Sequence, residues 1–527
     1  MLNSESPAPS EKRRGLHRIA TNYGRLIATM AMGIATVPLQ FKWLGMEGFG
    51  LLGLVGSSVG LGRMLQDMMR SSMVRELGAA WHNREDGKFR QSYAAAFQVC
   101  IIVAILTALF FVGIIFILPY MDIREDWIGA AQWITACEGV TTCLIVLLSP
   151  TINMFVVREY FFWHNLWTVV RRSAYLIATV IPFLIIGVED IPRGLTLFGT
   201  IVLIVNVVST LLLVSVLSVL DHRMFPALRG STKESMKKVA GTFGWNSGVV
   251  VAVNLHERIA NYIMNLFFGL WGNAVFSLAL RLVSYIRMAT LGLTFGLDSV
   301  SARLSTKEEH STLQSIFKHS TRMLSFVAFP AMVFVFLLAE PLLRMWVGKA
   351  VENPTKILPQ SEILVKIMVL GLTCRAISDG WMKLFYGAGF VHKYAPYILF
   401  GGLFNPILSI LFILVMPKNL GYTGAAIAYS TVLIFIHMFV MPKVTAKSVH
   451  LTFNKIINPT YKPLFIAIVS APALFASQLF SDSELINWTG VIAGVLCYGV
   501  LYSVLSWVLL LSKRERKLIV KLLTRAN

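Results

Sequence analysis

Fourteen apolar stretches, each long enough to cross a bilayer as a helix, run along the chain. A transmembrane helix needs about 20 mostly apolar residues. Such stretches fall at roughly 17–40, 49–74, 92–118, 128–157, 163–187, 194–219, 238–268, 272–300, 319–345, 360–388, 394–416, 420–441, 463–480 and 487–511. Hydrophobic residues make up 56% of the 527 residues and charged residues 14%, against about 45–50% and 25% in soluble domains. This composition excludes a soluble enzyme and a disordered chain, and predicts an all-α polytopic membrane protein with about 14 transmembrane helices.

The basic residues between these stretches predict how the chain is oriented. The net charge is +20, from 47 Lys and Arg against 27 Asp and Glu. If the N-terminus is cytoplasmic, 29 of the 47 fall in cytoplasmic segments and 6 in outer loops. Cytoplasmic loops of membrane proteins collect Lys and Arg, so this alternation predicts both termini on the cytoplasmic side. Lys12, Arg13 and Arg14 precede a first helix that we expect to remain uncleaved.

The sequence carries no sign of covalent chemistry. The longest outer loop, about 346–359, is too small for a catalytic domain. Gly87-Lys88 and Gly348-Lys349 lack the upstream glycine and the Ser/Thr of a phosphate-binding loop. The five cysteines lie in apolar stretches without metal-site or disulfide spacing. We therefore expect no enzyme activity, no cofactor and no metal.

A short internal similarity predicts how the helices are grouped. Leu44–Gly50 opens the second expected helix, and Leu270–Phe276 opens the eighth after a similar turn. Repeats of this kind are typical of transporters. The expected division is an N-lobe of helices 1–6 over residues 1–235, a C-lobe of helices 7–12 over 236–450, and helices 13–14 with a basic cytoplasmic tail over 451–527.

Twelve cations remain inside the apolar stretches, against five acids. The cations are Arg25, Arg63, Arg70, Arg171, Arg172, Arg258, Arg281, Arg287, Arg344, Lys366, Arg375 and Lys383, and the acids are Asp67, Glu138, Glu257, Asp298 and Asp379. A charge at the bilayer centre costs about 2.5–3.5 kcal/mol on insertion scales. Arg70, Arg171, Arg172, Arg344 and Lys366 are near enough to a membrane surface for their side chains to snorkel.

The other charges form stripes at helical spacing, which predicts a polar lining. One face of expected helix two carries Arg63, Asp67 and Arg70. One face of expected helix ten carries Arg375, Asp379 and Lys383, and one face of expected helix eight carries Arg287, Thr294 and Asp298. Arginine–acid pairs of this kind also serve as structural links. The surplus of arginine, however, predicts a net positive cavity and an anionic cargo, because guanidinium forks suit phosphate.

The candidate site follows from these stripes. The cargo-binding candidates are Arg25, Arg63, Arg258, Arg287, Arg375 and Lys383. The candidates for ion or proton coupling, or for charge pairing alone, are Asp67, Glu257, Asp298 and Asp379.

Three passages resemble one family of membrane proteins. Residues 43–54 (WLGMEGFGLLGL) are similar to the opening of helix two in polysaccharide biosynthesis flippases. Glu257-Arg258 with residues 272–279 (GNAVFSLA) resembles that family's passage from an acid–Arg pair into helix eight, although Phe276 and Ser277 depart from its pattern. Residues 421–428 (GYTGAAIA) look like the start of its helix twelve.

This family belongs to the multidrug/oligosaccharidyl-lipid/polysaccharide (MOP) exporter superfamily. The resemblance implies two six-helix lobes around a central cavity with two further helices. It implies a flippase of the bacterial cytoplasmic (inner) membrane that moves undecaprenyl-diphosphate-linked oligosaccharide for O-antigen, capsule or exopolysaccharide assembly, with polysaccharide polymerase or assembly proteins as partners and no nucleic acid.

Three alternatives remain open to different degrees. A flippase of the peptidoglycan precursor lipid II has the same helix count and cavity charge. An ion-coupled small-molecule antiporter of the superfamily usually stops at twelve helices, and a cationic cargo would require an acidic cavity. A membrane glycosyltransferase, polymerase or ligase is disfavoured by the small outer loops.

Overall fold

Regular structure in the described part of the chain is entirely helical. The computed structural model describes residues 11–82, 86–225, 228–240, 245–294, 297–306, 310–480, 488–513 and 515–517. No strand occurs among them, which confirms the expected all-α class. Packing divides the chain into two compact units, Met1–Ala274 and Val275–Asn527.

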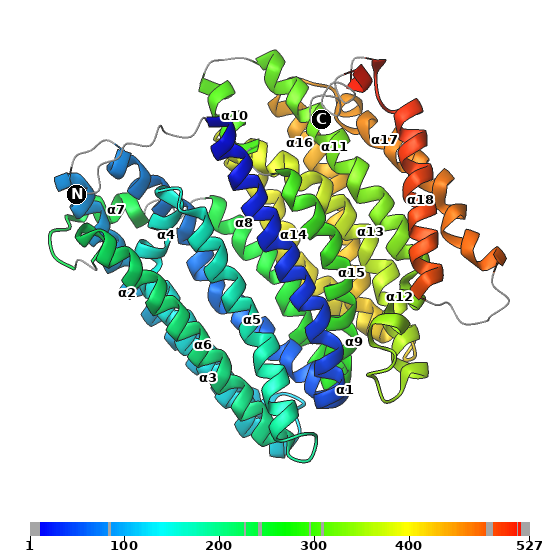
Figure 1. The fold of residues 1–527 in the computed structure, drawn as a ribbon, viewed down its shortest axis with the longest axis horizontal. Helices are drawn as coiled ribbons and strands as arrows, with labels where there is room; N and C mark the ends of the chain where they lie inside the picture. The colour runs from blue at the N-terminus through cyan, green and yellow to red at the C-terminus, as the bar shows by residue number, and fades with distance from the viewer. Residues whose placement is uncertain are drawn as a thin grey trace. The chain divides into compact units, whose positions relative to one another are not determined.

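The first unit is built from long helices joined by short turns (Figure 1). They are α1 (Glu11–His82), α2 (Asp86–Ile117), α3 (Glu125–Leu147), α4 (Ser149–Val157), α5 (Phe161–Ile185), α6 (Ile191–Leu220), α7 (Lys233–Ala240) and α8 (Trp245–Asn254), with the short 3₁₀ helices η1 (Leu118–Tyr120) and η2 (His222–Met224) and the π-helix η3 (Leu255–Ile259). The first part of α9 (Ala260–Leu291) completes the unit. Helix α3 packs against α2 and α6, while α1 packs against α5, α2 and α4. The buried core includes Trp43, Phe111 and Trp127, and the apolar surfaces of α2 and α6 remain exposed, as lipid-facing helices require.

Two glycines break the long helices α1 and α9 at matching points. Gly45 in α1 has φ 66° and ψ −166°, and Gly269 in α9 has φ 61° and ψ −159°. Glycine alone adopts this conformation without a steric cost from Cβ. The two breaks are 224 residues apart, as are Gly48 and Gly272. The structure therefore aligns Gly45 with Gly269. This alignment differs by two residues from the alignment of Leu44 with Leu270 that the sequence indicated.

The second unit begins within α9 and contains thirteen further helical segments among the described residues. They are η4 (Gly292–Thr294), α10 (Leu297–Thr306), α11 (His310–Leu337), α12 (Ala339–Val347), α13 (Pro354–Gly387), α14 (Val391–Val415), η5 (Gly421–Thr423), α15 (Gly424–Ile434), the π-helix η6 (Phe435–Val440) and α16 (Met441–Ser448), followed by α17 (Phe453–Ser470), the 3₁₀ segment η7 (Ala471–Phe480) and α18 (Trp488–Leu509). Helix α13 lies between α11 and α15, and α11 also packs against α17 (Figure 1).

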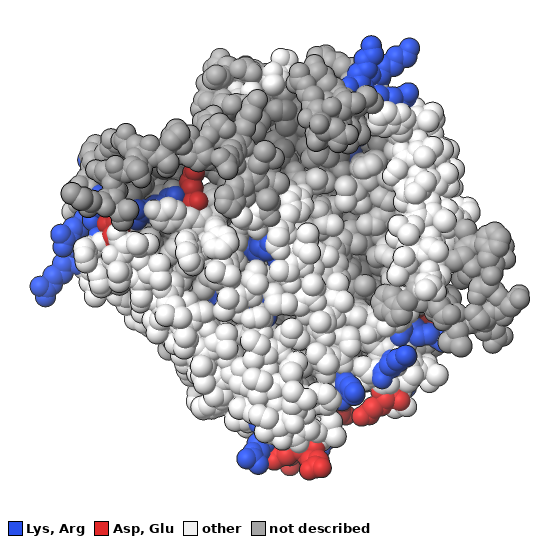
Figure 2. Space-filling view, in the orientation of Figure 1, with Lys and Arg blue, Asp and Glu red and all other residues white. Residues whose placement is uncertain are grey.

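The expected transmembrane stretches fall on these helices. Eleven helices of the described chain are long and apolar enough to cross a membrane, and two of them, Thr21–Met68 and Ser247–Thr294, are 48 residues long and contain the glycine breaks. Each of these two covers a pair of expected stretches, and α17 with η7 covers 463–480. Residues 241–244, 295–296 and 487, at which three expected stretches are interrupted or begin, lie outside the described residues. Figure 2 shows an uncharged surface over the middle of the helices, with most Lys, Arg, Asp and Glu near their ends.

The lobe boundaries expected from the repeat stay a prediction. The first compact unit extends through the break at Gly269, beyond residue 235. The expected boundaries follow the repeat, whereas the compact units follow packing.

Candidate functional site

Arg63 forms the centre of a charged group within the first unit. Its Nη2 lies 3.4 Å from Oε2 of Glu138, which is almost completely buried in α3. Oε1 of Glu138 accepts a hydrogen bond of 2.5 Å from the Tyr175 hydroxyl on α5. Three helices are thus linked through one carboxylate. A buried carboxylate requires such partners, because an unpaired one is costly in an apolar environment.

Arg171 and Arg172 on α5 belong to the same charged group. The charges of both interact with that of Arg63, and the charge of Arg172 also interacts with that of Arg258. Nε of Arg171 donates a 2.8 Å hydrogen bond to Asn206, and its guanidinium lies 4.7 Å from the Trp167 ring centroid. Arg171 is nevertheless only half-buried and Arg172 is exposed, so the expectation that both side chains snorkel towards a membrane surface stays a prediction.

Arg258 enters this cluster from the π-helix η3. Single-turn π-helices frequently occur at functional sites because they re-aim side chains. A Cβ added to Gly60 of α1 would lie 2.3 Å from Nε of Arg258. The Arg258 side chain therefore passes over α1 at a position where only glycine leaves enough room.

The remaining candidates of the first unit lie along the same elements. Arg25 is half-buried in α1, and Glu257 is half-buried beside Arg258 in η3. Asp67 is exposed one turn after Arg63, and its charge interacts with the Arg63 guanidinium. Arg63 also donates a hydrogen bond to a carboxylate outside its own helix, that of Glu138.

Arg287 and Asp379 form the corresponding pair of the second unit. Nε of Arg287, on α9, donates a 2.9 Å hydrogen bond to Oδ2 of Asp379 on α13. The expected stripe on α13 runs from buried to exposed: Arg375 is 2% exposed, Asp379 is 7% exposed, and Lys383 is exposed. Ser378, next to Asp379, contacts the ring of buried His437 in η6.

Asp298 lies near the start of α10. Its backbone carbonyl approaches Gly387 at the end of α13 so closely that an added Cβ would lie 1.9 Å away. Thr294 ends η4 and donates to the Leu291 carbonyl. Asp379, which accepts the hydrogen bond from Arg287, lies outside the stripe of Arg287, Thr294 and Asp298.

Two of the expected surface charges have local partners. Arg344 pairs with Glu340, and Lys366 pairs with Glu362 at 2.6 Å, each one helical turn away. This arrangement suits side chains near helix ends. The side chain of Arg70 lies outside the described residues.

Sequence reasoning placed Glu138 among the acids of the apolar stretches but did not name it as the partner of Arg63, and it did not single out Tyr175. The partners of Arg63 and Arg287 are 75 and 92 residues away, so helical spacing carries no trace of them. The one available signal was the repeat itself, because Arg63 and Arg287 are 224 residues apart, like the glycine breaks.

The chemistry that these groups can support is the binding of anions. In the first unit the charge of Arg63 interacts with those of Glu138 and Asp67, and the charges of Arg171 and Arg172 interact with that of Glu138. Guanidinium groups form charge-assisted hydrogen bonds with phosphate or carboxylate. Among the described residues, no group of three or more His, Cys, Asp and Glu is placed to hold a metal ion.

Comparison with known proteins agrees with this architecture. The MatE family model matches residues 250–411. A solved structure of the lipid II flippase MurJ, in an inward closed conformation, superposes with a TM-score of 0.67 at 14% identity over 93% of this chain and 99% of that chain. An inward-facing multidrug resistance MATE family transporter of the MOP superfamily gives 0.65 at 14% identity over 80% and 95%.

A third solved structure adds a difference in function. A MOP superfamily transporter from Pyrococcus furiosus superposes with a TM-score of 0.61 at 14% identity, over 82% of this chain and 96% of that chain. Its binding pocket is described as having reverse polarity, which suggests a different function for that protein. No curated protein matches the sequence.

The chain is thus a polytopic membrane protein with the fold of MOP superfamily transporters and flippases. At 14% identity, these similarities establish the fold alone. The class of cargo has to be inferred from the charged residues of the membrane helices.

Proposed function

We propose that the protein is a flippase that moves undecaprenyl-diphosphate-linked oligosaccharide across the bacterial cytoplasmic (inner) membrane for surface polysaccharide biosynthesis. The arginine cluster of the first unit carries this proposal. Arg63, Arg171, Arg172 and Arg258 lie on membrane helices of one unit. The charge of Arg63 interacts with those of Arg171 and Arg172, and the charge of Arg172 interacts with that of Arg258. Charged groups at membrane depth are costly and usually mark a cargo pathway, and guanidinium forks match the oxygens of a diphosphate.

The second unit would supply further contacts. Arg287 and Arg375 lie on its membrane helices, and Lys383 extends the same stripe of α13. Asp379 is hydrogen-bonded to Arg287 and Asp67 interacts with Arg63. We assign these acids to charge pairing first, and Glu257 and Asp298 remain candidates for ion coupling. Arg25 is a further cargo contact.

The sign of the charge disfavours a multidrug antiporter. A cationic drug would meet a cluster with more arginine than carboxylate, and like charges repel. The described reverse polarity of the Pyrococcus furiosus protein supports the use of pocket charge to separate functions within one fold.

A lipid II flippase is the second candidate, because the fold matches MurJ over nearly the whole of both chains. Lipid II also carries a diphosphate, so the arginines fit it equally well. The two functions differ in the glycan and in the effect of loss: loss of a lipid II flippase is lethal, whereas cells lacking a surface-polysaccharide flippase survive.

The remaining parts of the proposal concern orientation and movement. Both termini would lie in the cytoplasm, in keeping with the basic cytoplasmic loops. Lobes of residues 1–235 and 236–450 would alternate access to a cationic central cavity, with helices 13 and 14 over 451–527. Partners would be polysaccharide polymerase or assembly proteins, and no cofactor or enzyme activity is involved.

A deletion strain tests the proposal. We expect viable cells that lose surface polysaccharide and accumulate undecaprenyl-diphosphate oligosaccharide in the inner leaflet. Inviability that MurJ can rescue would assign lipid II instead. Normal polysaccharide with no trapped intermediate would contradict both flippase assignments.

Point variants in the same strain test the cluster. Arg172 is exposed, so Arg172→Gln should reduce export at least tenfold while the amount of protein in the membrane is unchanged. Arg193→Gln, at the exposed start of α6, is the matched control and should export normally. Equal export by the two variants would contradict the role of the cluster.

A further inference from the structure

A groove of about 560 Å³ lies on the first unit between α2 and α3. We call it the α2–α3 groove. Its lining residues are Phe97, Ile101, Ala104, Ile105, Ala108, Cys143, Leu147, Leu148 and Leu228. Every one of them is apolar or a free thiol. None belongs to the arginine cluster, so the groove is a separate site.

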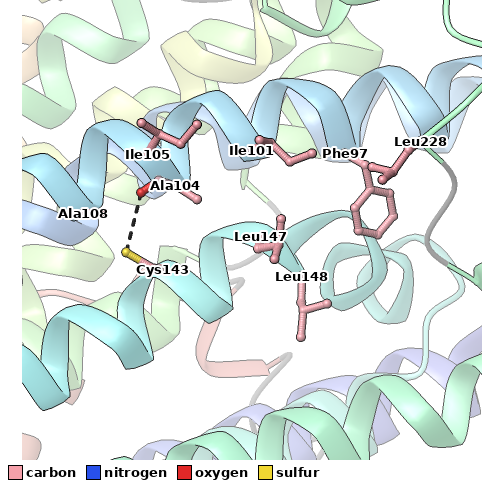
Figure 3. A pocket seen from close by; sticks show the side chains of 9 residues that line it. All are labelled: Phe97, Ile101, Ala104, Ile105, Ala108, Cys143, Leu147, Leu148 and Leu228. Carbon is pink, nitrogen blue, oxygen red and sulfur yellow. Dashed lines mark hydrogen bonds between the residues drawn. The ribbon is translucent and has the colours of Figure 1, made fainter.

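The groove has the length of one membrane leaflet. Its lining on α2 extends from Phe97 to Ala108, which is about 16 Å of helix at 1.5 Å per residue. Half of a 30 Å hydrocarbon core is about 15 Å. In Figure 3, Leu228 and Phe97 lie at one end and Cys143 lies below Ala104 towards the other, where its thiol contacts the Ala104 carbonyl at 3.5 Å. The dimensions and the lining fit one extended hydrocarbon chain.

The end at Leu228 is formed by a segment that is fixed to α2. Nε2 of Gln98 donates a 2.8 Å hydrogen bond to the Leu228 carbonyl, and the Ser231 hydroxyl donates to Oε1 of Gln98 at 2.6 Å. Thr232 and Ser235 then cap α7, with each hydroxyl accepting from the other's backbone N–H. The mouth of the groove is therefore a defined structure.

The same segment is basic and lies at the ends of the membrane helices. Arg229, Lys233 and Lys237 are exposed around the capped start of α7, while Val239 is buried and Met236 packs on the apolar core. A short helix with an apolar inner face and lysines outside is typical of the membrane interface. Basic residues beside an intramembrane groove on one side of the bilayer recognise anionic lipid headgroups.

We propose that the α2–α3 groove and the segment of Leu228 to Lys237 bind an anionic glycerophospholipid. One acyl chain would occupy the groove, and the phosphate would lie at Arg229 and Lys233. Exposed Leu228, which adjoins both the groove and Arg229, places the chain and the headgroup at one continuous site. This lipid would hold α2, α3 and α7 together at one membrane surface.

Photolabelling of the full chain in liposomes tests the proposal. The probes are phosphatidylglycerol and phosphatidylcholine with the same diazirine-tagged acyl chain, and labelled peptides are mapped. We expect phosphatidylglycerol to label residues 101–108 and 143–148 in clear preference to phosphatidylcholine. Ala108→Trp should fill the groove and abolish this label, while Leu109→Trp, on an exposed neighbour outside the lining, should leave it unchanged.

Charge variants separate headgroup recognition from ordinary lipid contact. Arg229→Gln with Lys233→Gln should lower the preference for phosphatidylglycerol about tenfold, whereas Arg193→Gln at the opposite end of α6 should not. Equal labelling by the two lipids would overturn the proposal, as would label that persists in Ala108→Trp. Preferential labelling by a tagged undecaprenyl phosphate would assign the groove to a cargo tail, and a cross-linked dimer would assign it to a second copy; either result would also overturn the proposal.

Discussion

Arg63 and Arg287 occupy the same position in the two repeats of the chain. Each lies 18 residues after the positive-φ glycine that breaks its helix, Gly45 or Gly269. Each is hydrogen-bonded to a carboxylate on the fourth membrane helix of its own repeat, Glu138 on α3 or Asp379 on α13. The repeat therefore preserves an ion pair as well as a bend.

The Arg287–Asp379 pair is expected to stabilise the fold, and Arg287 is expected to have a second role in transport that does not depend on the pair. Arg287→Gln leaves the Asp379 carboxylate, only 8% exposed, without its hydrogen-bonded cation, which should cost about 3 kcal/mol of unfolding free energy. The double variant Arg287→Gln/Asp379→Asn should regain most of this stability and still fail to export. Thermal unfolding in detergent and the export assay provide the two measurements. Recovery of export in the double variant would show that the arginine acts only through the pair.

Gly60 is expected to position Arg258. Gly60→Ala forces Arg258 away, because the new Cβ would lie 2.3 Å from its Nε. Export should fall severalfold with little change in melting temperature, since the displaced atoms end a flexible side chain. Gly56→Ala is the matched control: nothing lies within 4 Å of its Cβ, and alanine favours a helix by about 1 kcal/mol over glycine. A similar loss of export in both variants would refute a specific role for Gly60.

The breaks at Gly45 and Gly269 are expected to require glycine. An alanine at either position would have to adopt a region of positive φ and extended ψ that is essentially restricted to glycine, at a cost of about 1–3 kcal/mol. Gly269→Ala also brings Cβ to 2.4 Å from a carboxylate oxygen of Asp122, so its melting temperature should fall further than that of Gly45→Ala. Gly24→Ala, with open space around its Cβ, should be neutral or stabilising. Unchanged unfolding in both break variants would mean that these helices can run straight.

The contact between Glu515 and Arg322 gives a defined pH dependence. Burial raises the pKa of the Glu515 carboxyl, but the Ser512 N–H and hydroxyl and the Arg322 guanidinium outweigh it and lower the pKa to about 2. Stability from this depressed pKa is present above the unfolded value of about 4.3 and is lost as the pH falls towards 2.

Glu515→Gln tests this dependence by comparison with the unchanged protein. The difference in melting temperature between the two should be the same at pH 7 and pH 6 and should shrink at pH 3. A difference that grows on acidification would reverse the assigned direction of the pKa shift.

The membrane helices could be predicted because apolar length alone decides which segments cross a bilayer. The α2 and α14 segments, for example, contain long uncharged runs that have no other stable location. The stripe on α13 was equally visible, because Arg375, Asp379 and Lys383 repeat at helical spacing.

The partners of the arginines could not be predicted, because they depend on tertiary packing. Asp67, one turn from Arg63, looked like its natural partner, whereas Glu138 on α3 holds the hydrogen bond. Arg172 is exposed in α5, and helical spacing gives no sign that its charge interacts with those of Arg63 and Arg258 on other elements. Similarly, the backbone conformation at Gly269, not the neighbouring Leu270, sets the register of the repeat.

The separation of the paired residues along the chain has a consequence for biogenesis. Glu138 follows Arg63 by 75 residues, and Asp379 follows Arg287 by 92. At a synthesis rate of about 5–20 residues per second, a ribosome supplies each arginine with its carboxylate within about 4–18 s, before translation of the following repeat or tail is complete. Each half can thus neutralise its own arginine as it leaves the translocon, and neither must wait for the other.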